Sequence, residues 1–412
     1  MSLEFSIDKK LPNGRGRAGK IQTAHGVIET PAFIVVGTKA TVKALTPEQV
    51  ASLGAEAVLA NTYHLYLEPG EEVMKKAGGL HSFMNWQGPT FTDSGGFQAF
   101  SLGAAFDNKV GKISKKGSEV KSTTKAEEKD DDERSAHSAM AKVDEDGVTF
   151  KSIIDGSSHR FTPERSIEIQ HNIGADILFA FDECTSPHAS YEYQREAMDR
   201  THRWAKRSLD YHLAHKKEQA FPQSLFGIVQ GGRHKDLRKE SAAIIGKMDF
   251  DGFGIGGSFD KEDLHTAVGW VADELPEGKP RHLLGIGEPL DLILGIENGM
   301  DTFDCVAPTR IARNGSLYTA TGKVNILNAE YKTDFAPIEK ECGCYTCTHY
   351  TRAYLAHLFR AKEMMAATLA SIHNLYFLVH LVKKARQAIL DGTFSDYKEH
   401  FIKSYSTNEI SN

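Results

Sequence analysis

Eight short apolar runs recur along the chain, and each ends in a polar or glycine-rich motif. The runs occupy residues 33–38, 57–65, 89–97, 176–185, 225–232, 252–257, 282–289 and 300–306. Within each run the apolar residues are continuous and do not alternate with polar ones. This pattern is typical of parallel strands that are buried on both faces of a sheet.

Helical patterns lie between most of these runs. Thr46 before Pro47, and Thr162 before Pro163, have the N-cap and first-position residues of a helix start. Helical periodicity also marks residues 191–217, 235–247, 261–275 and 289–298. Eight strands alternating with helices predict an α/β fold, a (β/α)8 TIM barrel over residues 1–330. A doubly wound open sheet is the alternative, but no G-x-G-x-x-G fingerprint follows the first strand.

Residues 107–146 interrupt this rhythm. The segment is highly charged, contains few aromatic residues and has no periodic apolar face. Such a composition predicts a disordered or loosely ordered insertion. A solvated loop is one interpretation, and an arm that contacts RNA or a partner is the other.

Three of the five cysteines lie together in the segment ECGCYTC at residues 341–347. The N-terminal residues MSLEFSIDKK contain no apolar core of a signal peptide, and no stretch approaches the roughly 18 apolar residues of a membrane span. We therefore expect a cytoplasmic protein with reduced thiols, in which clustered cysteines bind metal more often than they pair. Residues 331–412 are predicted to form a metal-binding subdomain closed by C-terminal helices.

The chain carries a formal net charge of −6, which argues against indiscriminate nucleic-acid binding but allows a local basic groove. Several polar residues lie at the predicted strand ends, and in a barrel these ends gather at one face. A single aspartate there commonly forms a turn or caps a helix, whereas three carboxylates and an amide predict a polar pocket. The strand-end residues are Asp93, Asp182, Gln230, Gly257 and Asp304.

Two glycine-rich motifs adjoin these residues. In TDSGGFQ, Gly95 and Gly96 let a flat ligand approach the backbone, and Phe97 is placed to stack on it. In GIGG, residues 254–257, backbone N–H groups are exposed to a carbonyl oxygen of a ligand. A tight turn is the alternative interpretation of the first motif.

The motifs TDSGGFQ, FDECT, IVQGG, GIGG and FDCVAPTRIARNG, followed by Cys-x-Cys-x-x-Cys and a distant histidine, together resemble the bacterial tRNA-guanine transglycosylases. The resemblance covers nearly the whole chain except residues 107–146. It implies an enzyme that exchanges guanine at the wobble position (34) of tRNAs with a GUN anticodon for a 7-deazaguanine, in queuosine modification. It also implies a homodimer.

The resemblance further implies roles for individual residues. Asp304 corresponds to the nucleophile, and Asp93 to the general acid/base. Asp182 would accept from guanine N1–H and the 2-amino group. The remaining implied contacts are Gln230 and the Gly257 N–H to guanine O6, Ser94 in the base-binding site, Phe97 and Leu284 on the faces of the ring, and Arg310 and Arg313 on tRNA. For the two arginines, a simple surface position is the alternative.

The same resemblance implies a structural Zn2+ site. Cys342, Cys344 and Cys347 supply three thiolates, and the family spacing selects His373 as the fourth ligand. His357 and His380 lie on the same helical stretch and are its rivals. Cys184 and Cys305 are expected to be packing residues near the strand ends.

The chain departs from the family pattern at two places. Ser258, Phe259 and Asp260 follow the GIGG motif where small residues are usual, which bears on whether 7-aminomethyl-7-deazaguanine (preQ1) or queuine is the substrate. Glu68 replaces an expected basic residue. Two other functions are alternatives to the transglycosylase: a barrel hydrolase acting on free nucleosides, and a non-catalytic tRNA-binding subunit, which would be expected to lack Asp93 and Asp304.

Overall fold

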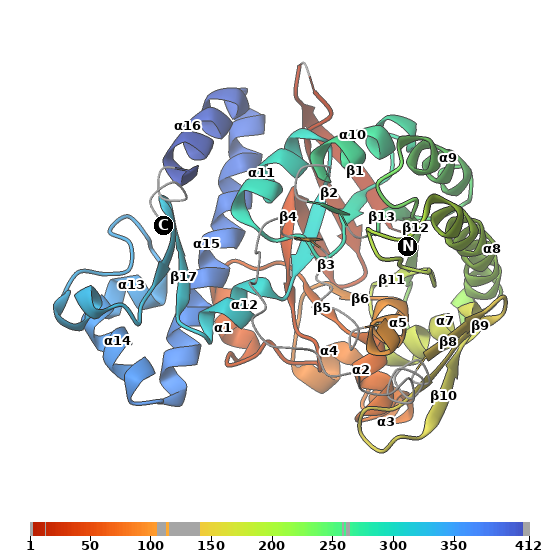
Figure 1. Cartoon of the computed structure of the whole chain (residues 1–412), viewed down its shortest axis with the longest axis horizontal. Helices are drawn as coiled ribbons and strands as arrows, with labels where there is room; N and C mark the ends of the chain where they lie inside the picture. The colour runs from red at the N-terminus through yellow and green to blue at the C-terminus, as the bar shows by residue number, and fades with distance from the viewer. Residues whose placement is uncertain are drawn as a thin grey trace, which may run out of the picture. The chain divides into compact units, whose positions relative to one another are not determined.

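The computed structural model describes residues 3–12, 14–104, 113–114, 141–257, 259–260 and 264–406 (Figure 1). The chain divides into two compact units. The first unit comprises Met1–Ala60, Ala77–Phe91 and Glu277–Asn412, and the second comprises Asn61–Lys76 and Thr92–Pro276. The predicted boundary near residue 330, between a barrel and a metal-binding subdomain, stays a prediction.

All eight predicted strands are present, and they form one closed barrel in the order β11, β12, β13, β15, β16, β4, β5, β6. This topology confirms the (β/α)8 prediction and excludes the open sheet. Nearly every strand residue is buried, as the continuous apolar runs indicated. The strands are β4 Ala32–Val36, β5 Val58–Ala60, β6 Thr90–Thr92, β11 Ile177–Phe179, β12 Ser224–Val229, β13 Gly252–Ile255, β15 Arg281–Leu283 and β16 Thr302–Cys305.

In the second unit, successive helices α7, α8, α9 and α10 pack side by side around β11, β12 and β13 (Figure 1). The Thr162 side chain accepts from Arg165 N at the start of α7, and Gly174 in the left-handed region ends that helix, as the sequence predicts. The helices of this unit are α2 Thr62–Leu67, α3 Glu71–Lys76, α5 Gly96–Ala104, α7 Pro163–Ile173, α8 Tyr191–His215, the 3-10 turn η1 Lys216–Glu218, α9 Lys235–Ile245 and α10 Leu264–Glu274.

Two small sheets belong to the second unit as well. Strands β8 Ala141–Asp144, β9 Gly147–Lys151 and β10 Ser158–Phe161 form an antiparallel sheet, and β7 Ile113–Ser114 pairs with β14 Phe259–Asp260. Most of the predicted insertion, residues 107–112 and 115–140, lies outside the described residues. Residues 141–146, at the end of the predicted insertion, are instead part of strand β8 and of the β8–β9 turn. Asp144 closes this turn by accepting from the N–H groups of Asp146 and Gly147.

The first unit begins with an antiparallel sheet of β1 Glu4–Lys10, β2 Arg17–Thr23 and β3 Gly26–Thr30. Arg17 of β2 forms a fully buried two-pronged pair with Asp301, which directly precedes β16. The Arg17 guanidinium also donates to backbone carbonyls of Glu277 and Lys279. The remaining short elements of this unit are α1 Pro47–Ser52, α4 Leu80–Met84, α11 Pro289–Glu297, α12 Ala307–Ala312, β17 Ser316–Thr319, β18 Gly322–Asn325 and the 3-10 turn η2 Ala329–Thr333.

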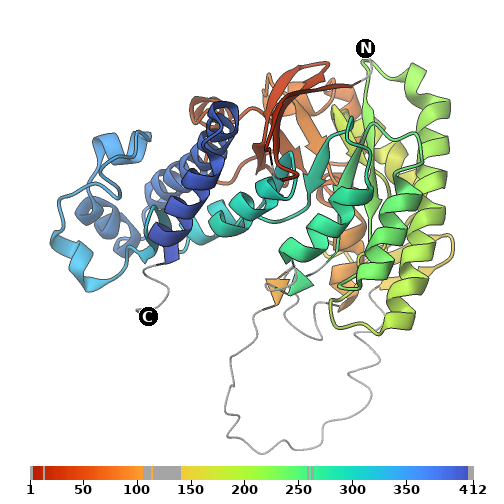
Figure 2. The same ribbon diagram turned by 90° about the horizontal axis from the view of Figure 1, so that it is seen from above.

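The C-terminal helices of the first unit are α13 Tyr345–His349, α14 Arg352–Arg360, α15 Met364–Asp391 and α16 Phe394–Ser406. The stretch from residue 352 is two helices instead of one, because Lys362 adopts a left-handed conformation with φ 58° between them. Seen from above, α15 and α16, the darkest blue helices, lie side by side (Figure 2).

Helix α15 is long and apolar enough, by length and composition alone, to cross a membrane, with a window of mean hydropathy 1.4. The prediction that no segment approaches this limit was therefore wrong for α15. Neutral polar residues such as His373 and Asn374 break its apolar run without lowering the mean hydropathy below that of a span. However, 67% of the window is buried inside the protein, which is the pattern of a core helix.

Candidate active site and metal centre

In the second unit, three predicted residues at the ends of β6, β11 and β12 come together around one carboxylate. Ser94 Oγ donates to Asp182 Oδ1 at 3.0 Å, and Gln230 Nε2 donates to Asp182 Oδ2 at 2.6 Å. All three side chains are buried. The Gln230 Oε1 atom has no hydrogen-bond partner among the described residues, so the cluster retains unused polar capacity. The Asp182 carboxylate, which accepts hydrogen bonds, and the Gln230 amide are thus held side by side.

Gly257 lies beside this cluster, and its glycine identity is required. A Cβ atom there would come within 2.4 Å of Arg238 Nη2 and 3.3 Å of Gln230 Oε1, and Gly257 has φ +103°. The buried Arg238 of α9 donates to the carbonyl oxygens of Gly232 at 2.6 Å and Gly256 at 2.7 Å. Burial lowers the pKa of Arg238 to about 9. This arginine ties together the loops after β12 and β13, and the sequence analysis did not find it.

Asp93 follows β6 and is surrounded by donors from its own unit. Its Oδ1 accepts from the backbone N–H groups of Thr62 at 2.9 Å and Gly95 at 3.2 Å, and its Oδ2 accepts from Asn61 Nδ2. Asn61 also caps α2 by accepting from His64 N. The start of α2 therefore orients the Asp93 carboxylate, a function that the apolar pattern of residues 57–65 did not indicate.

Asp304 lies on β16 in the first unit, and its carboxylate is also anchored. Its Oδ1 accepts from Gly285 N at 2.8 Å and lies 3.0 Å from His282 Nε2. His282 is fully buried, and its Nδ1 lies 2.8 Å from Thr302 Oγ1. Because a carboxylate only accepts, His282 Nε2 is the donor in the contact with Asp304. His282 was not among the predicted site residues, since a histidine inside an apolar run is typical of a core position.

The remaining predicted ligand-binding residues have less defined surroundings. Leu284 is half-buried directly after β15 and before Gly285, and half-buried Phe97 lies in the first turn of α5. Arg310 is exposed on α12. Arg313 is half-buried at the end of α12, and burial together with the charge of Arg310 lowers its pKa.

The four predicted metal ligands converge in the first unit. The Sγ atoms of Cys342, Cys344 and Cys347 lie 3.8, 3.6 and 3.3 Å from His373 Nδ1, and all four ligand atoms lie within 4.8 Å of one another. Hydrogen bonds from Cys344 and Cys347 lower the pKa of the Cys342 thiol. The cluster can therefore hold a metal ion.

Local structure explains why these ligands meet. Cys344 caps α13, where its Sγ accepts from Cys347 N at 3.3 Å. His373 is buried in α15, and its Nε2 lies 2.7 Å from the Tyr318 carbonyl oxygen, which directs Nδ1 to the sulfurs. Of the two rivals, His357 is exposed on α14 and half-buried His380 stacks on Tyr376, and neither belongs to the ligand cluster.

The chain is similar to known proteins along nearly its whole length. The family model described as queuine tRNA-ribosyltransferase matches residues 13–136 and 129–407. The chain belongs to the queuine tRNA-ribosyltransferase family. A queuine tRNA-ribosyltransferase of Caldanaerobacter subterraneus is 47% identical over 410 residues, covering 99% of both chains. Those of Thermoanaerobacter sp. and Desulforamulus reducens are 46% and 45% identical, covering 99% and 98% of this chain and 99% and 100% of theirs.

Queuine tRNA-ribosyltransferases are pentosyltransferases that act on guanine in tRNA, and the chain resembles their bacterial members along its whole length. Membership in this family identifies the chain as an enzyme of the queuosine modification pathway. The nucleoside hydrolase and the non-catalytic subunit are thereby set aside as primary assignments.

Proposed function

We propose that the enzyme exchanges guanine at the wobble position of tRNAs with a GUN anticodon for a 7-deazaguanine, with preQ1 as the first choice and queuine as the second. The observation that carries this proposal is the fixed Asp182 carboxylate beside the Gln230 amide. Guanine presents two donors, N1–H and the 2-amino group, next to the acceptor O6. An anchored acceptor beside an amide donor matches that edge.

In this proposal Asp304 is the nucleophile. One Asp304 oxygen bonds to ribose C1′ while the bond from C1′ to guanine N9 breaks, and the electron pair of that bond goes to the leaving base. The incoming base then attacks C1′ through N9, expels the carboxylate and loses its N9 proton. Two displacements retain the stereochemistry, as in retaining glycosidases. The contacts from Gly285 N and His282 keep one carboxylate oxygen fixed throughout.

Asp93 is the general acid/base. It would protonate the departing guanine and take the proton from the incoming base. Its anchoring by Asn61, Thr62 and Gly95 restricts the carboxylate to one orientation. The carboxyl group gains and loses a proton in each cycle, and a fixed orientation lets it exchange that proton with both the departing and the incoming base.

The other contacts follow the same proposal. Phe97 and Leu284 are the groups assigned to the faces of the base, and Ser94 holds Asp182 for recognition. Arg310, which is exposed, and Arg313 are assigned to the tRNA backbone or flanking bases. The side chains of Ser258, Phe259 and Asp260, which bear on the 7-substituent, lie outside the described residues. The target nucleotide must leave the anticodon stack to reach these groups.

Zinc is the metal that we propose for the Cys342, Cys344, Cys347 and His373 cluster. Three thiolates and one imidazole are a typical donor set of structural zinc sites, and four protein ligands leave no open position for a substrate. Bound zinc would stabilise the fold around α13 and α15 and take no part in the chemistry.

We also propose a cytoplasmic homodimer. Phe335 is 77% exposed, Met364 is 88% exposed and Tyr345 is 51% exposed, all in the first unit. The homodimer is what the family resemblance implies, closed symmetric dimers are the commonest oligomers, and these side chains are the apolar groups that such an interface would bury.

A competition assay tests the proposed function. tRNA that carries radiolabelled guanine at the wobble position is incubated with enzyme and unlabelled preQ1, queuine or 7-cyano-7-deazaguanine. We expect label release that depends on the added base, with preQ1 most effective. Equal release without any acceptor base would indicate a hydrolase and would contradict the proposal.

A further inference from the structure

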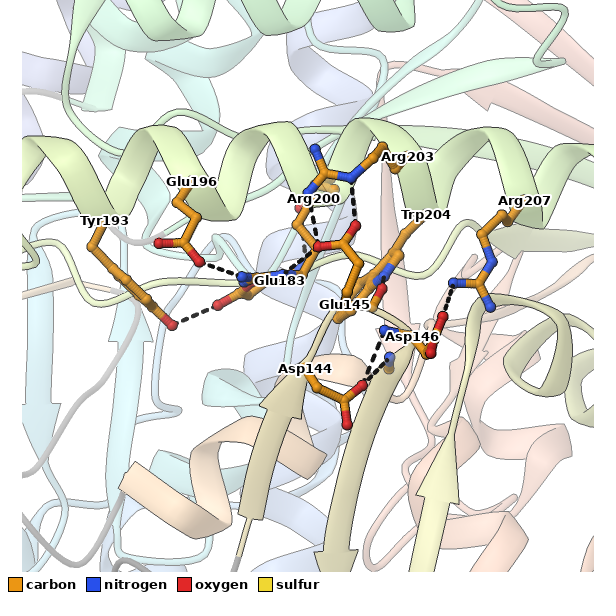
Figure 3. Close-up of polar contacts among 12 residues, drawn as sticks. Asp144, Glu145, Asp146, Glu183, Tyr193, Glu196, Arg200, Arg203, Trp204 and Arg207 are labelled. Carbon is orange, nitrogen blue, oxygen red and sulfur yellow. Dashed lines mark hydrogen bonds and ion pairs between the residues drawn. The ribbon is translucent and has the colours of Figure 1, made fainter.

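Glu183 follows Asp182 directly in the sequence. Its side chain points to Tyr193 and Arg200 of helix α8 (Figure 3). Its side chain is only 2% exposed. The Tyr193 hydroxyl donates to Glu183 Oε1 at 2.6 Å, and Arg200 Nη1 donates to Oε2. Glu183 N also donates to Thr201 Oγ1 at 3.0 Å. Three residues of α8 thus hold the residue next to Asp182.

The pair between Glu183 and Arg200 is largely withdrawn from water, with the Arg200 side chain 10% exposed. Burial and the bond to Glu183 raise the pKa of Tyr193, so its hydroxyl remains a donor throughout the neutral range. Loss of the Glu183 charge would leave the buried Arg200 guanidinium with only its more exposed partners Glu196 and Glu145, and so weaken the compensation of its charge. The loop would then relieve this cost by moving.

The β8–β9 turn contacts the same helix through Glu145 (Figure 3). Glu145 pairs with Arg203 through two hydrogen bonds and lies 3.5 Å from Arg200 Nε. Trp204 Nε1 donates to the Glu145 carbonyl oxygen at 2.8 Å. The turn that follows the charged insertion is therefore connected, through Arg200, to the loop that carries Asp182.

The geometry points to Glu183 as a positioning residue for Asp182. Neighbouring residues of this extended loop point to opposite sides: Asp182 to Ser94 and Gln230, and Glu183 to Arg200 and Tyr193. A rotation of the backbone between them would move both carboxylates together. The buried ion pair therefore fixes the direction of the Asp182 acceptor, and Glu145 limits the freedom of Arg200. This inference rests on the proposed function, in which Asp182 binds the base.

The test uses the full-length enzyme with Glu183→Gln, Tyr193→Phe and Glu145→Gln. Asp210→Asn is the matched control, because Asp210 is exposed on the same helix and pairs only with Lys206 among the described contacts. For each variant, guanine affinity without tRNA, KM for guanine, KM for tRNA and kcat are measured, together with the thermal midpoint. Tyr193→Phe removes one hydroxyl from a 42% exposed side chain and should fold even if Glu183→Gln does not.

We expect Glu183→Gln to raise the guanine Kd and KM by about tenfold, the effect of weakening one charged hydrogen bond. Tyr193→Phe and Glu145→Gln should raise them by roughly threefold, since each leaves the ion pair in place. KM for tRNA should stay unchanged in all variants, and Asp210→Asn should behave as wild type.

Unchanged guanine affinity in Glu183→Gln and Tyr193→Phe would overturn the inference. A parallel rise of both KM values with a lowered thermal midpoint would overturn it as well, because that result indicates a merely structural role. Failure of the proposed function is distinguishable from either: in that case wild-type enzyme itself would not bind guanine, or Asp182→Asn would bind it normally.

Discussion

At the scale of single residues, three carboxylates of similar appearance in the sequence have different surroundings. Side chains of Ser94 and Gln230 bind Asp182, whereas Asp93 accepts from the backbone N–H groups of Thr62 and Gly95 as well as from the Asn61 side chain. The third carboxylate, Asp304, accepts from Gly285 N and lies beside His282 Nε2. A backbone N–H keeps its direction whatever rotamer its own side chain adopts, whereas a side-chain donor can reorient when a ligand binds. These differences suit Asp182 for recognition and Asp93 for chemistry.

Asp182→Asn tests the recognition role. The variant replaces an acceptor oxygen with an amide donor that faces the donors of guanine, at a cost of about 1–3 kcal/mol for each group left unpaired. Guanine exchange should fall by at least about tenfold, while tRNA affinity changes little. Initial rates at varied guanine, and tRNA gel shifts, measure the two quantities. Unimpaired guanine exchange would contradict the assigned role.

Residues at strand ends were predictable, because an aspartate or glutamine that interrupts an apolar run is visible in the sequence. Their partners were not. Asn61 and His282 lie inside apolar runs, and Arg238 and Arg200 lie on helices that read as solvent-facing. Only the folded chain shows that both arginines are buried and turned to the strand-end loops.

At the scale of elements, the interface of α7 and α8 contains a buried imidazole pair. His171 Nε2 lies 2.9 Å from His212 Nδ1. Burial, with the nearby charges of His212 and His215, lowers the pKa of His171 to about 3, and burial with the charge of Lys216 lowers that of His212 to about 4. Both rings are therefore neutral in the folded protein at physiological pH.

Acid should weaken this interface. The pKa of each histidine is near 6.5 in the unfolded chain and lower in the folded one, so the unfolded state binds protons first. Stability is complete above about pH 7 and is lost as pH falls from about 6.5 toward the folded pKa values, by roughly 2 kcal/mol per histidine at pH 5. Thermal midpoints measured from pH 5 to 8 should depend less on pH in His171→Gln than in wild type. Exposed His188→Gln is the control; an identical pH dependence in wild type and His171→Gln would refute the assignment.

Helix α15 connects the metal cluster to the rest of the first unit. His373 faces the three thiols, and the adjacent Asn374 donates to the carbonyl oxygens of Pro308 and Ser316. His373→Ala should reduce zinc content well below one ion per chain and lower the thermal midpoint, because three thiolates do not complete a tetrahedral site. His357→Ala, on the neighbouring helix α14, should keep its zinc. Metal analysis of purified protein decides; zinc retained in His373→Ala but lost in His357→Ala would invalidate the ligand set.

The elements themselves were largely predictable, since parallel strands buried on both faces leave continuous apolar runs. The sheet of β1, β2 and β3 was not predicted. Strand β1 is mostly exposed and β3 alternates in burial, and β2 begins with three buried residues but has no continuous apolar run. The break at Lys362 was missed because neither glycine nor proline marks it. In both cases tertiary packing decides what local pattern leaves open.

At the scale of the whole molecule, the exposed apolar side chains of the first unit predict self-association. Light scattering should give twice the 45.5 kDa chain mass at micromolar concentration. Met364→Lys with Phe335→Asp should shift the mass toward that of one chain, because charge is costly to bury at an interface. A wild-type mass of 45.5 kDa at every concentration tested would rule out the dimer.

In the proposed mechanism, Asp304 forms a covalent bond to the ribose and Asp93 transfers the proton. Wild-type enzyme given tRNA and a slow acceptor base should accumulate an RNA–protein adduct that survives denaturing gels. Asp304→Asn should abolish it, apart from a trace restored by deamidation, and Asp93→Ala should slow turnover at the proton-transfer step. Peptide mapping of the adduct is the most direct measurement. We expect a ribosyl group on Asp304, and a ribosyl group on Asp93 would contradict the proposed mechanism.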